Sequence, residues 1–78
     1  MANIHLAPQE TFQHTHDHPS LTRVVQGKIR FYMNGIAVEM TAGAEILVPE
    51  HTSHRLENIG RTPAEVYCGH RVENGVPQ

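Results

Sequence analysis

Turn-forming residues divide this chain into short pieces, and this division is the feature that most limits its fold. Gly, Pro, Asn, Asp and Ser recur at close intervals, in the segments 17–20, 34–35, 42–43, 49–53, 60–63 and 74–75. The runs between these segments have the length of β-strands and are too short for ordinary helices. Evenly spaced short strands without a helical stretch predict an all-β barrel or sandwich.

The segment 28–40 has the clearest strand pattern. Its apolar residues alternate with polar ones on both sides of Asn34-Gly35: Ile29, Phe31, Met33, Ile36, Val38 and Met40. Asn-Gly suits a two-residue type I′ turn, because both central positions need a positive φ. Such a turn pairs each apolar residue of the first half with one of the second half and places all six on one face. The sequence therefore predicts a β-hairpin over 28–40.

Further strands are expected at 11–16, 21–26, 45–48, 54–58 and 64–72. Successive side chains of a strand point to opposite faces. Three sets of residues then share a face: Phe12, His14 and His16; His54, Leu56 and Asn58; Ala64, Val66, Cys68, His70 and Val72. Residues 1–78 make one domain, with no linker and no repeat, and we expect the ends, 1–8 and 73–78, to be loosely ordered.

Composition excludes several classes of function. The chain has 78 residues and a net charge of −2. A slightly negative charge provides no electrostatic attraction to nucleic acid or to an acidic membrane surface. It has no apolar run of the roughly 20 residues that span a membrane, and its first residues do not resemble a secretory leader. The single cysteine, Cys68, excludes an internal disulfide and favours a reducing, cytoplasmic setting.

Seven histidines are a large number for so short a chain. His14 and His16 are two residues apart on a predicted strand, so their imidazoles lie side by side on one face. His18 continues this series, although Pro19 indicates that the strand is ending. A second group combines His51, in a turn, with His54, which opens the next strand. Histidine-rich stretches are also often mere surface composition, but two separate segments that converge are typical of a metal site.

The spacing around these histidines resembles the two motifs of the cupin family. In the first, His14-Thr15-His16 is followed by three residues, then Ser20 where the family has Glu, then six residues to Gly27. In the second, Gly43 is followed by AEILV, Pro49, Glu50, His51 in place of a second Gly, Thr52-Ser53, His54, RLE and Asn58. The motif-like segments cover 14–27 and 43–58, and the predicted hairpin fills the region between them.

The resemblance implies a cupin-type double-stranded β-helix, or jelly-roll barrel, with a divalent transition metal (Fe, Mn, Ni, Zn or Cu) inside one end. His14, His16 and His54 occupy the ligand positions, and His18 and His51 are candidates for a fourth ligand. The family's carboxylate ligand falls on Ser20, so the common His/Glu set is incomplete. Three neutral ligands leave a bound ion its full charge, which strengthens it as a Lewis acid.

Other residues are more simply structural. Cys68 is expected to be a small buried hydrophobe, Asn58 a turn residue that forms hydrogen bonds, and His70 a strand-end surface residue; His5 has no assigned role. Four residues could bind an anionic substrate only if they line a cavity: Arg23, Arg30, Tyr32 and Arg55. Solvated surface charges are the more common case. Arg23 shares its face with Leu21 and Val25, whereas Arg30 and Tyr32 oppose the apolar face of the hairpin.

Three functions remain open at this stage, because cupins host many unrelated activities. The first is a metal-dependent enzyme acting on a small polar substrate, of oxygenase, isomerase or lyase type. The second is a non-catalytic module that binds or senses a metal or a small ligand, and the third is a metal-free barrel. Uncovered sheet edges and a thin core also predict a homodimer.

Overall fold

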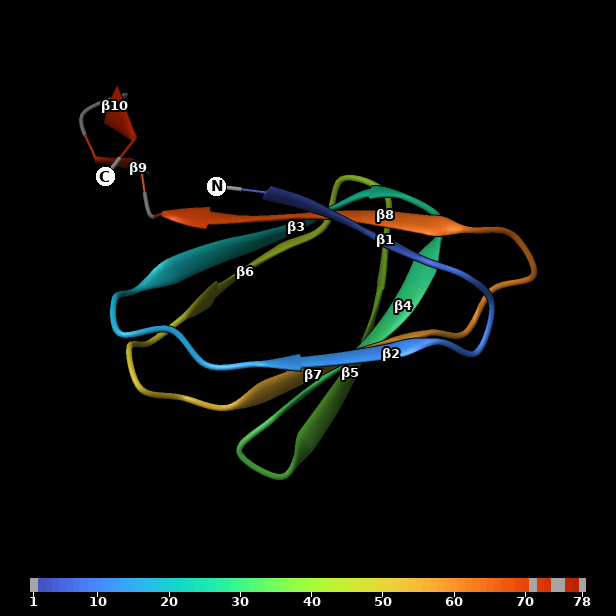
Figure 1. Ribbon diagram of the computed structural model, residues 1–78, viewed down its shortest axis with the longest axis horizontal. Helices are drawn as coiled ribbons and strands as arrows, with labels where there is room; N and C mark the ends of the chain where they lie inside the picture. Colours follow the sequence, from blue (N-terminus) through green and yellow to red (C-terminus); the bar gives the residue numbers. More distant parts are fainter. Residues whose placement is uncertain (1, 71, 74–75, 78) are drawn as a thin grey trace.

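The strands form two antiparallel sheets that face each other (Figure 1). The structure is a computed structural model that describes residues 2–70, 72–73 and 76–77. The upper sheet of Figure 1 has the strand order β1-β8-β3-β6, and the lower sheet has the order β2-β7-β4-β5. Their bounds are β1 Ala2–Leu6, β2 Thr11–His14, β3 Ser20–Gln26, β4 Lys28–Met33, β5 Ile36–Thr41, β6 Glu45–Val48, β7 His54–Asn58 and β8 Ala64–His70. Two short strands, β9 Val72–Glu73 and β10 Val76–Pro77, pair with each other.

The chain passes repeatedly from one sheet to the other, as a jelly roll does. Only β4 and β5 are consecutive strands that pair directly within the two main sheets. The prediction of an all-β jelly roll is confirmed, and no helix is present in the described part of the chain. Within that part, accordingly, there is no helix long and apolar enough to cross a membrane.

The hairpin predicted over 28–40 is confirmed in its register. Met33 pairs with Ile36, Phe31 with Val38 and Ile29 with Met40. Asn34 and Gly35 have φ values of 52° and 76°, as a type I′ turn requires. The shared apolar face is buried at Ile29, Phe31 and Met40. On the β5 side near the turn it is exposed, since Ile36 and Val38 are 64% and 43% exposed.

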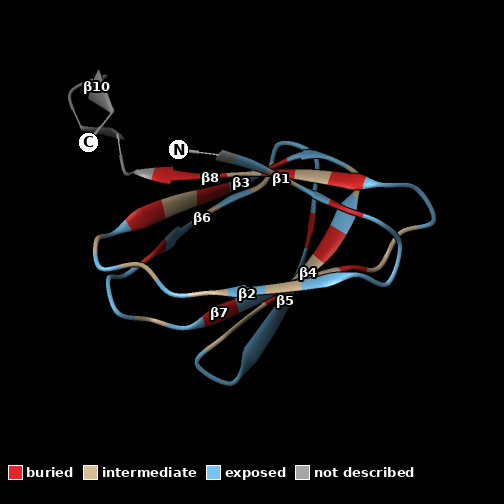
Figure 2. Cartoon of the chain, viewed as in Figure 1, coloured by how far each residue is buried: buried red, intermediate tan, exposed pale blue. Residues whose placement is uncertain are grey.

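The hydrophobic core lies between the two sheets (Figure 2). Alternating residues of the strands supply its buried members: Leu6, Val24, Ile29, Phe31, Met40, Val48, Leu56, Ala64, Val66 and Cys68. Cys68 is therefore the small buried residue that the sequence predicted. Its Sγ lies 4.0 Å from the Thr22 hydroxyl, and burial raises the pKa of its thiol.

The inward face of β3 is polar at its start. Ser20, Thr22 and Val24 are fully buried, whereas Arg23 and Val25 on the opposite parity are exposed. Arg23 lies outside the barrel, where it forms an ion pair with Glu45. Hydrophobic alternation could not indicate this orientation, because Leu21 and Val25 are apolar and stand on the outer face.

Residues 2–6 lie within the amino-terminal segment 1–8 that was expected to be loosely ordered, and the structure places them in a strand. These residues form β1, which pairs with β8 along its whole length, from Ala2 opposite Cys68 to Leu6 opposite Ala64. Leu6 is only 2% exposed, so burial against the core holds the strand in place. Of the segment 73–78, the structure describes only the backbone of residues 73, 76 and 77.

Candidate functional site

Four histidines meet at one end of the barrel. His14, the last residue of β2, pairs directly with His54, the first residue of β7. Their ring centroids are 6.1 Å apart, and the ring of His16 lies 4.1 Å from that of His14 and 5.6 Å from that of His54. The ring of His18 lies 5.1 Å from that of His16. We call His14, His16, His18 and His54 the histidine cluster.

Strand pairing and one loop contact bring this cluster together. Opposed residues of an antiparallel pair have Cβ atoms only about 5 Å apart, which accounts for His14 and His54. β2 ends at His14, so His16 and His18 lie beyond the strand that the sequence predicted over 11–16. The backbone N–H of His51 donates a hydrogen bond of 2.7 Å to the carbonyl oxygen of His16 and thereby ties the two histidine-bearing loops together.

The hydrogen bonds of the cluster indicate which ring nitrogens are available. Nδ1 of His54 lies 3.2 Å from the carbonyl oxygen of Thr52. A carbonyl only accepts, so Nδ1 carries the proton and Nε2 keeps its lone pair. Nε2 of His54 is buried without a hydrogen-bond partner among the described residues, and so is Nε2 of His16. Buried polar atoms without a partner are rare, and two in one cluster indicate a site for a ligand.

Two imidazoles of the cluster, those of His16 and His54, are held toward the neutral form. Burial lowers the pKa of His16 to about 4, and the neighbouring His14, His54 and His18 add to this effect. Burial also lowers the pKa of His54, assisted by His14 and opposed by the hydrogen bond to Thr52. Neutral imidazole is the form that binds a metal ion, so the electrostatics of the cluster favour ligation near neutral pH.

The separations of the rings fit a shared metal ion. An imidazole nitrogen binds such an ion at about 2.1 Å, which puts the ring centre about 3.2 Å from the ion. Two rings at tetrahedral or octahedral angles then lie about 4.5–5.2 Å apart. The observed separations of 4.1, 5.6 and 6.1 Å among His14, His16 and His54 bracket this range.

The rings are not yet oriented as ligands of one ion. In the described part of the chain, no three His, Cys, Asp or Glu side chains have the arrangement of a metal site. The planes of His16 and His54 are within 23° of parallel and the two rings are stacked, an arrangement that turns ring faces, not ring nitrogens, toward each other. Rotation of a ring about its side-chain torsions is therefore needed for ligation.

The remaining candidates lie elsewhere. The side chain of His51 is 71% exposed, and its Nδ1 lies 3.8 Å from a carboxylate oxygen of Glu50. His5 is exposed and lies beside Glu65. The side chain of His70 is outside the described residues. Asn58 is buried and forms three side-chain hydrogen bonds, to Leu6, Thr62 and Gly60, and thus has the structural role expected from the sequence.

Sequence reasoning missed the aromatic and polar residues around the cluster. Phe31 stacks on His54 with a centroid separation of 5.6 Å, and Phe12 stacks on His14 at 5.5 Å. Phe12 could have been found, because it shares the strand face of His14. Phe31 comes from β4, and its position depends on the pairing of β4 with β7. Ser20, in the position of the family's carboxylate, has a buried Oγ without a hydrogen-bond partner.

Comparison with known proteins agrees with this architecture. A family model described as "Cupin domain" matches residues 2–73. The search of curated proteins found no match. Among solved structures, a predicted oxalate decarboxylase from Thermotoga maritima has a TM-score of 0.76 and 26% identity, over 85% of this chain and 59% of that one.

Two further structures show the same likeness. An RmlC-like cupin from Shewanella frigidimarina has a TM-score of 0.70 and 25% identity, over 82% of this chain and 57% of that one. KdgF from Halomonas sp. has a TM-score of 0.73 and 19% identity, over 85% of this chain and 62% of that one. The chain thus spans less than two thirds of the length of each of these three proteins.

Proposed function

The chain belongs to the cupin domain family, and from this premise we propose that it binds a divalent transition-metal ion through His14, His16 and His54. The observation that carries the proposal is the pair of buried Nε2 atoms, on His16 and His54, for which the described part of the chain offers no hydrogen-bond partner. His18 is the fourth ligand in this proposal, because its ring is next to that of His16. His51 is left out, because its side chain is exposed beside Glu50.

The residues around the cluster have roles that follow from their contacts. The Thr52 carbonyl holds the ring of His54 in the tautomer whose Nε2 can bind the ion. Phe12 and Phe31 stack on His14 and His54 and limit the access of water. A bound ion would supply Lewis-acid chemistry, and imidazole ligands suit Fe, Ni, Zn and Cu in particular, with Mn less favoured.

We infer a small polar molecule as the ligand of this centre. Support comes from the neighbour described as a predicted oxalate decarboxylase, with which the chain shares 26% identity. An enzyme and a non-catalytic binding or sensing module are both consistent with the cluster. The second is favoured by Ser20, which provides a hydroxyl where the resemblance expects a carboxylate. Turnover of a small carboxylate by the metal-loaded protein, absent in His54→Ala, would assign the first.

Metal analysis tests the proposal. We expect the purified, untagged protein to bind about one ion per chain after incubation with Zn²⁺. His14→Ala and His54→Ala should each lower the affinity at least tenfold, because each removes one of the proposed ligands, from the first and the second histidine-bearing segment respectively. His51→Ala is the matched control and should bind like the parent. A parent that holds little metal, in an amount unchanged by His54→Ala, would contradict the proposal.

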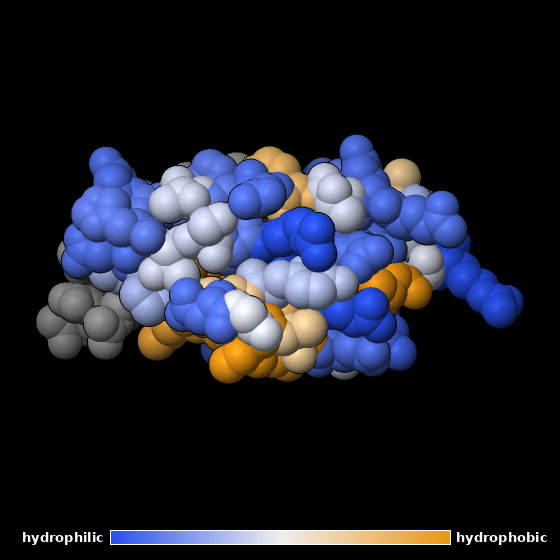
Figure 3. Space-filling view, turned by 90° about the horizontal axis from the view of Figure 1, so that it is seen from below, coloured by the Kyte–Doolittle hydropathy of each residue, from blue (hydrophilic) through white to orange (hydrophobic). Residues whose placement is uncertain are grey.

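We also propose that the protein forms a homodimer and that it works in a reducing, cytoplasmic setting. β5 is an edge strand of the lower sheet, and it carries Ile36 and Val38 in exposed positions. Viewed from below, the molecule is mostly hydrophilic, with hydrophobic side chains gathered toward one side (Figure 3). In this dimer, β5 pairs in antiparallel orientation with β5 of a second copy across a two-fold axis. The pairing would satisfy the backbone hydrogen-bonding groups at the edge of each sheet and cover Ile36 and Val38 of both copies.

Light scattering tests the dimer. At micromolar concentration we expect a mass of two chains for the parent. Val38→Lys should give a mass of one chain, because it places two like charges in the proposed interface. Leu47→Lys alters another exposed apolar residue, on the upper sheet, and should leave the dimer intact. A monomeric parent, or a dimer that Leu47→Lys disrupts and Val38→Lys does not, would refute this arrangement.

A further inference from the structure

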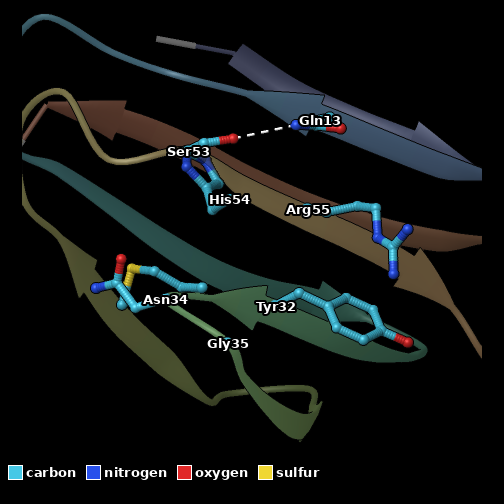
Figure 4. Close-up of a pocket in the computed structure, with 8 residues that line it drawn as sticks. Gln13, Tyr32, Asn34, Gly35, Ser53, His54 and Arg55 are labelled. Atoms are coloured by element: carbon cyan, nitrogen blue, oxygen red, sulfur yellow. Dashed lines mark hydrogen bonds between the residues drawn. The ribbon is translucent and has the colours of Figure 1, made fainter.

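A pocket of about 240 Å³ opens on the lower sheet, at the ends of β4 and β7 that lie nearest the hairpin turn (Figure 4). Gln13, Ser53 and Arg55 line one side of it, and Tyr32 and Asn34 line the other. His54 of the histidine cluster also belongs to the lining. Its lining contains the guanidinium of Arg55 and no acidic side chain, although the whole chain has a net charge of −2. The local charge of the pocket is therefore opposite in sign to that of the molecule.

Arg55 is positioned in this pocket by stacking and not by an ion pair. Its guanidinium carbon lies 4.2 Å from the centre of the Tyr32 ring, on the neighbouring strand. In the described part of the chain Arg55 has no carboxylate partner, whereas Arg30 on the same face lies 3.2 Å from a carboxylate oxygen of Glu39. The N–H groups at the edge of the Arg55 guanidinium therefore remain available for a ligand.

A hydrogen bond holds the platform under Arg55 in place. The hydroxyl of Tyr32 donates to a carboxylate oxygen of Glu57 at 2.7 Å. Glu57 is thereby engaged with Tyr32 and lies 4.0 Å from Arg30. The carboxylate nearest to Arg55 along β7 is used to fix the ring on which Arg55 stacks. Such preorganisation lowers the entropic cost of binding.

Two neutral groups complete the donor set. The side-chain amide of Gln13 donates to Oγ of Ser53 at 3.1 Å. Because Oγ of Ser53 accepts this bond, its own O–H is free to donate to a ligand. Asn34 presents a second amide from the turn across the pocket (Figure 4).

We propose that this pocket, which borders the histidine cluster at His54, is a binding site for a small carboxylate that does not require the metal. The planar fork of Arg55 matches the two oxygens of a carboxylate, and Ser53 and Asn34 can donate to the same group. One cation balances the single charge of a carboxylate, whereas a phosphate dianion would retain an uncompensated charge. The volume suits a small molecule, since it is below the range of about 300–1,000 Å³ for drug-sized ligands.

The polar groups of this pocket lie on the other face of the strands from the metal ligands. Gln13, Arg55 and Tyr32 are directly opposed neighbours on β2, β7 and β4. His54, which is buried on the inner face, borders the pocket, whereas His14, His16 and His18 are not part of its lining. A His16 variant that loses the metal can therefore keep this pocket.

Titrations of the protein with acetate, benzoate and inorganic phosphate, followed by two-dimensional ¹H–¹⁵N NMR, test the proposal. We expect saturable shifts at Gln13, Asn34 and Ser53 with acetate and benzoate, and at least tenfold weaker binding of both probes to Arg55→Gln. Arg61→Gln is the matched control, because Arg61 is exposed and outside the pocket. The spectra also establish that each variant is folded.

Two further variants separate the possible outcomes. Tyr32→Leu keeps the charge of Arg55 but removes its platform, and binding of benzoate should weaken severalfold. His16→Ala should keep carboxylate binding even where it loses the metal, so this proposal and the metal proposal can fail separately. Equal affinity of the parent and Arg55→Gln, equal losses in Arg55→Gln and Arg61→Gln, or tighter binding of phosphate than of both carboxylates would overturn the assignment.

Discussion

Asn58→Ala is expected to lower the free energy of unfolding by about 3 kcal/mol or more, because it leaves several buried polar groups without partners. The side-chain amide of Asn58 donates hydrogen bonds of 2.9 Å to the carbonyl oxygens of Leu6 and Thr62. Its side-chain oxygen accepts a bond of 2.8 Å from the N–H of Gly60. Asn58 is only 1% exposed, so water cannot replace these bonds without a rearrangement.

One of the three bonds joins β7 to the distant end of β1, and the other two join β7 to the connection that follows it. Urea denaturation of parent and variant, each metal-free, measures the difference. Asn3→Ala is the matched control: it removes an exposed amide whose bond is to Glu65, and it should cost less than about 0.5 kcal/mol. A change below about 1 kcal/mol in Asn58→Ala would mean that Asn58 does not hold these segments together.

Metal-free protein is expected to lose stability as the pH falls from 7 to 5, mainly because of His16. Its pKa is about 4 in the folded protein and 6.5 as a model value, so the unfolded chain binds more protons between these two values. Stability from this residue is complete above pH 6.5 and falls as the pH decreases toward 4. We expect a loss on the order of 1–2 kcal/mol between pH 7 and pH 5, which includes a reduction for solvent screening.

The free energy of unfolding at pH 7, 6 and 5 measures this slope. His16→Gln should flatten it, because glutamine does not titrate, and the exposed His51 provides the control His51→Gln, which should keep the parent's slope. In the metal-loaded parent the decline should begin at a lower pH, because a bound ion competes with protons for the imidazoles. A stability that is constant from pH 7 to pH 5, or a slope that His16→Gln leaves unchanged, would contradict the expectation.

Local patterns were sufficient where the chemistry of neighbouring residues decides the structure. Asn34-Gly35 specifies a type I′ turn, and this turn sets the register of β4 with β5. Alternation on β7 correctly placed His54, Leu56 and Asn58 inside the barrel. The same argument gave the shared direction of His14 and His16, although β2 ends before His16.

Local patterns were insufficient where burial depends on distant strands. Residues 2–6 have no strong strand pattern, and they form β1 because β8 offers a free edge and the core accepts Leu6. Ser20 and Thr22 are polar, yet their side chains point into the barrel. The pairing of β3 with both β6 and β8 determines which side chains of β3 face inward. Ile36 and Val38 share the apolar face of the hairpin, yet they are 64% and 43% exposed.

The sequence by itself determined the fold class, the central hairpin and the three histidines of the candidate centre, because short-range turn chemistry and the two-residue period of a strand are local properties. Only the tertiary structure decided that His18 and not His51 joins the histidine cluster, and that Tyr32 and Arg55 meet over a pocket on the outer face. These facts depend on which strands pair and where loops cross, and such long-range pairing is set by the burial of the whole core.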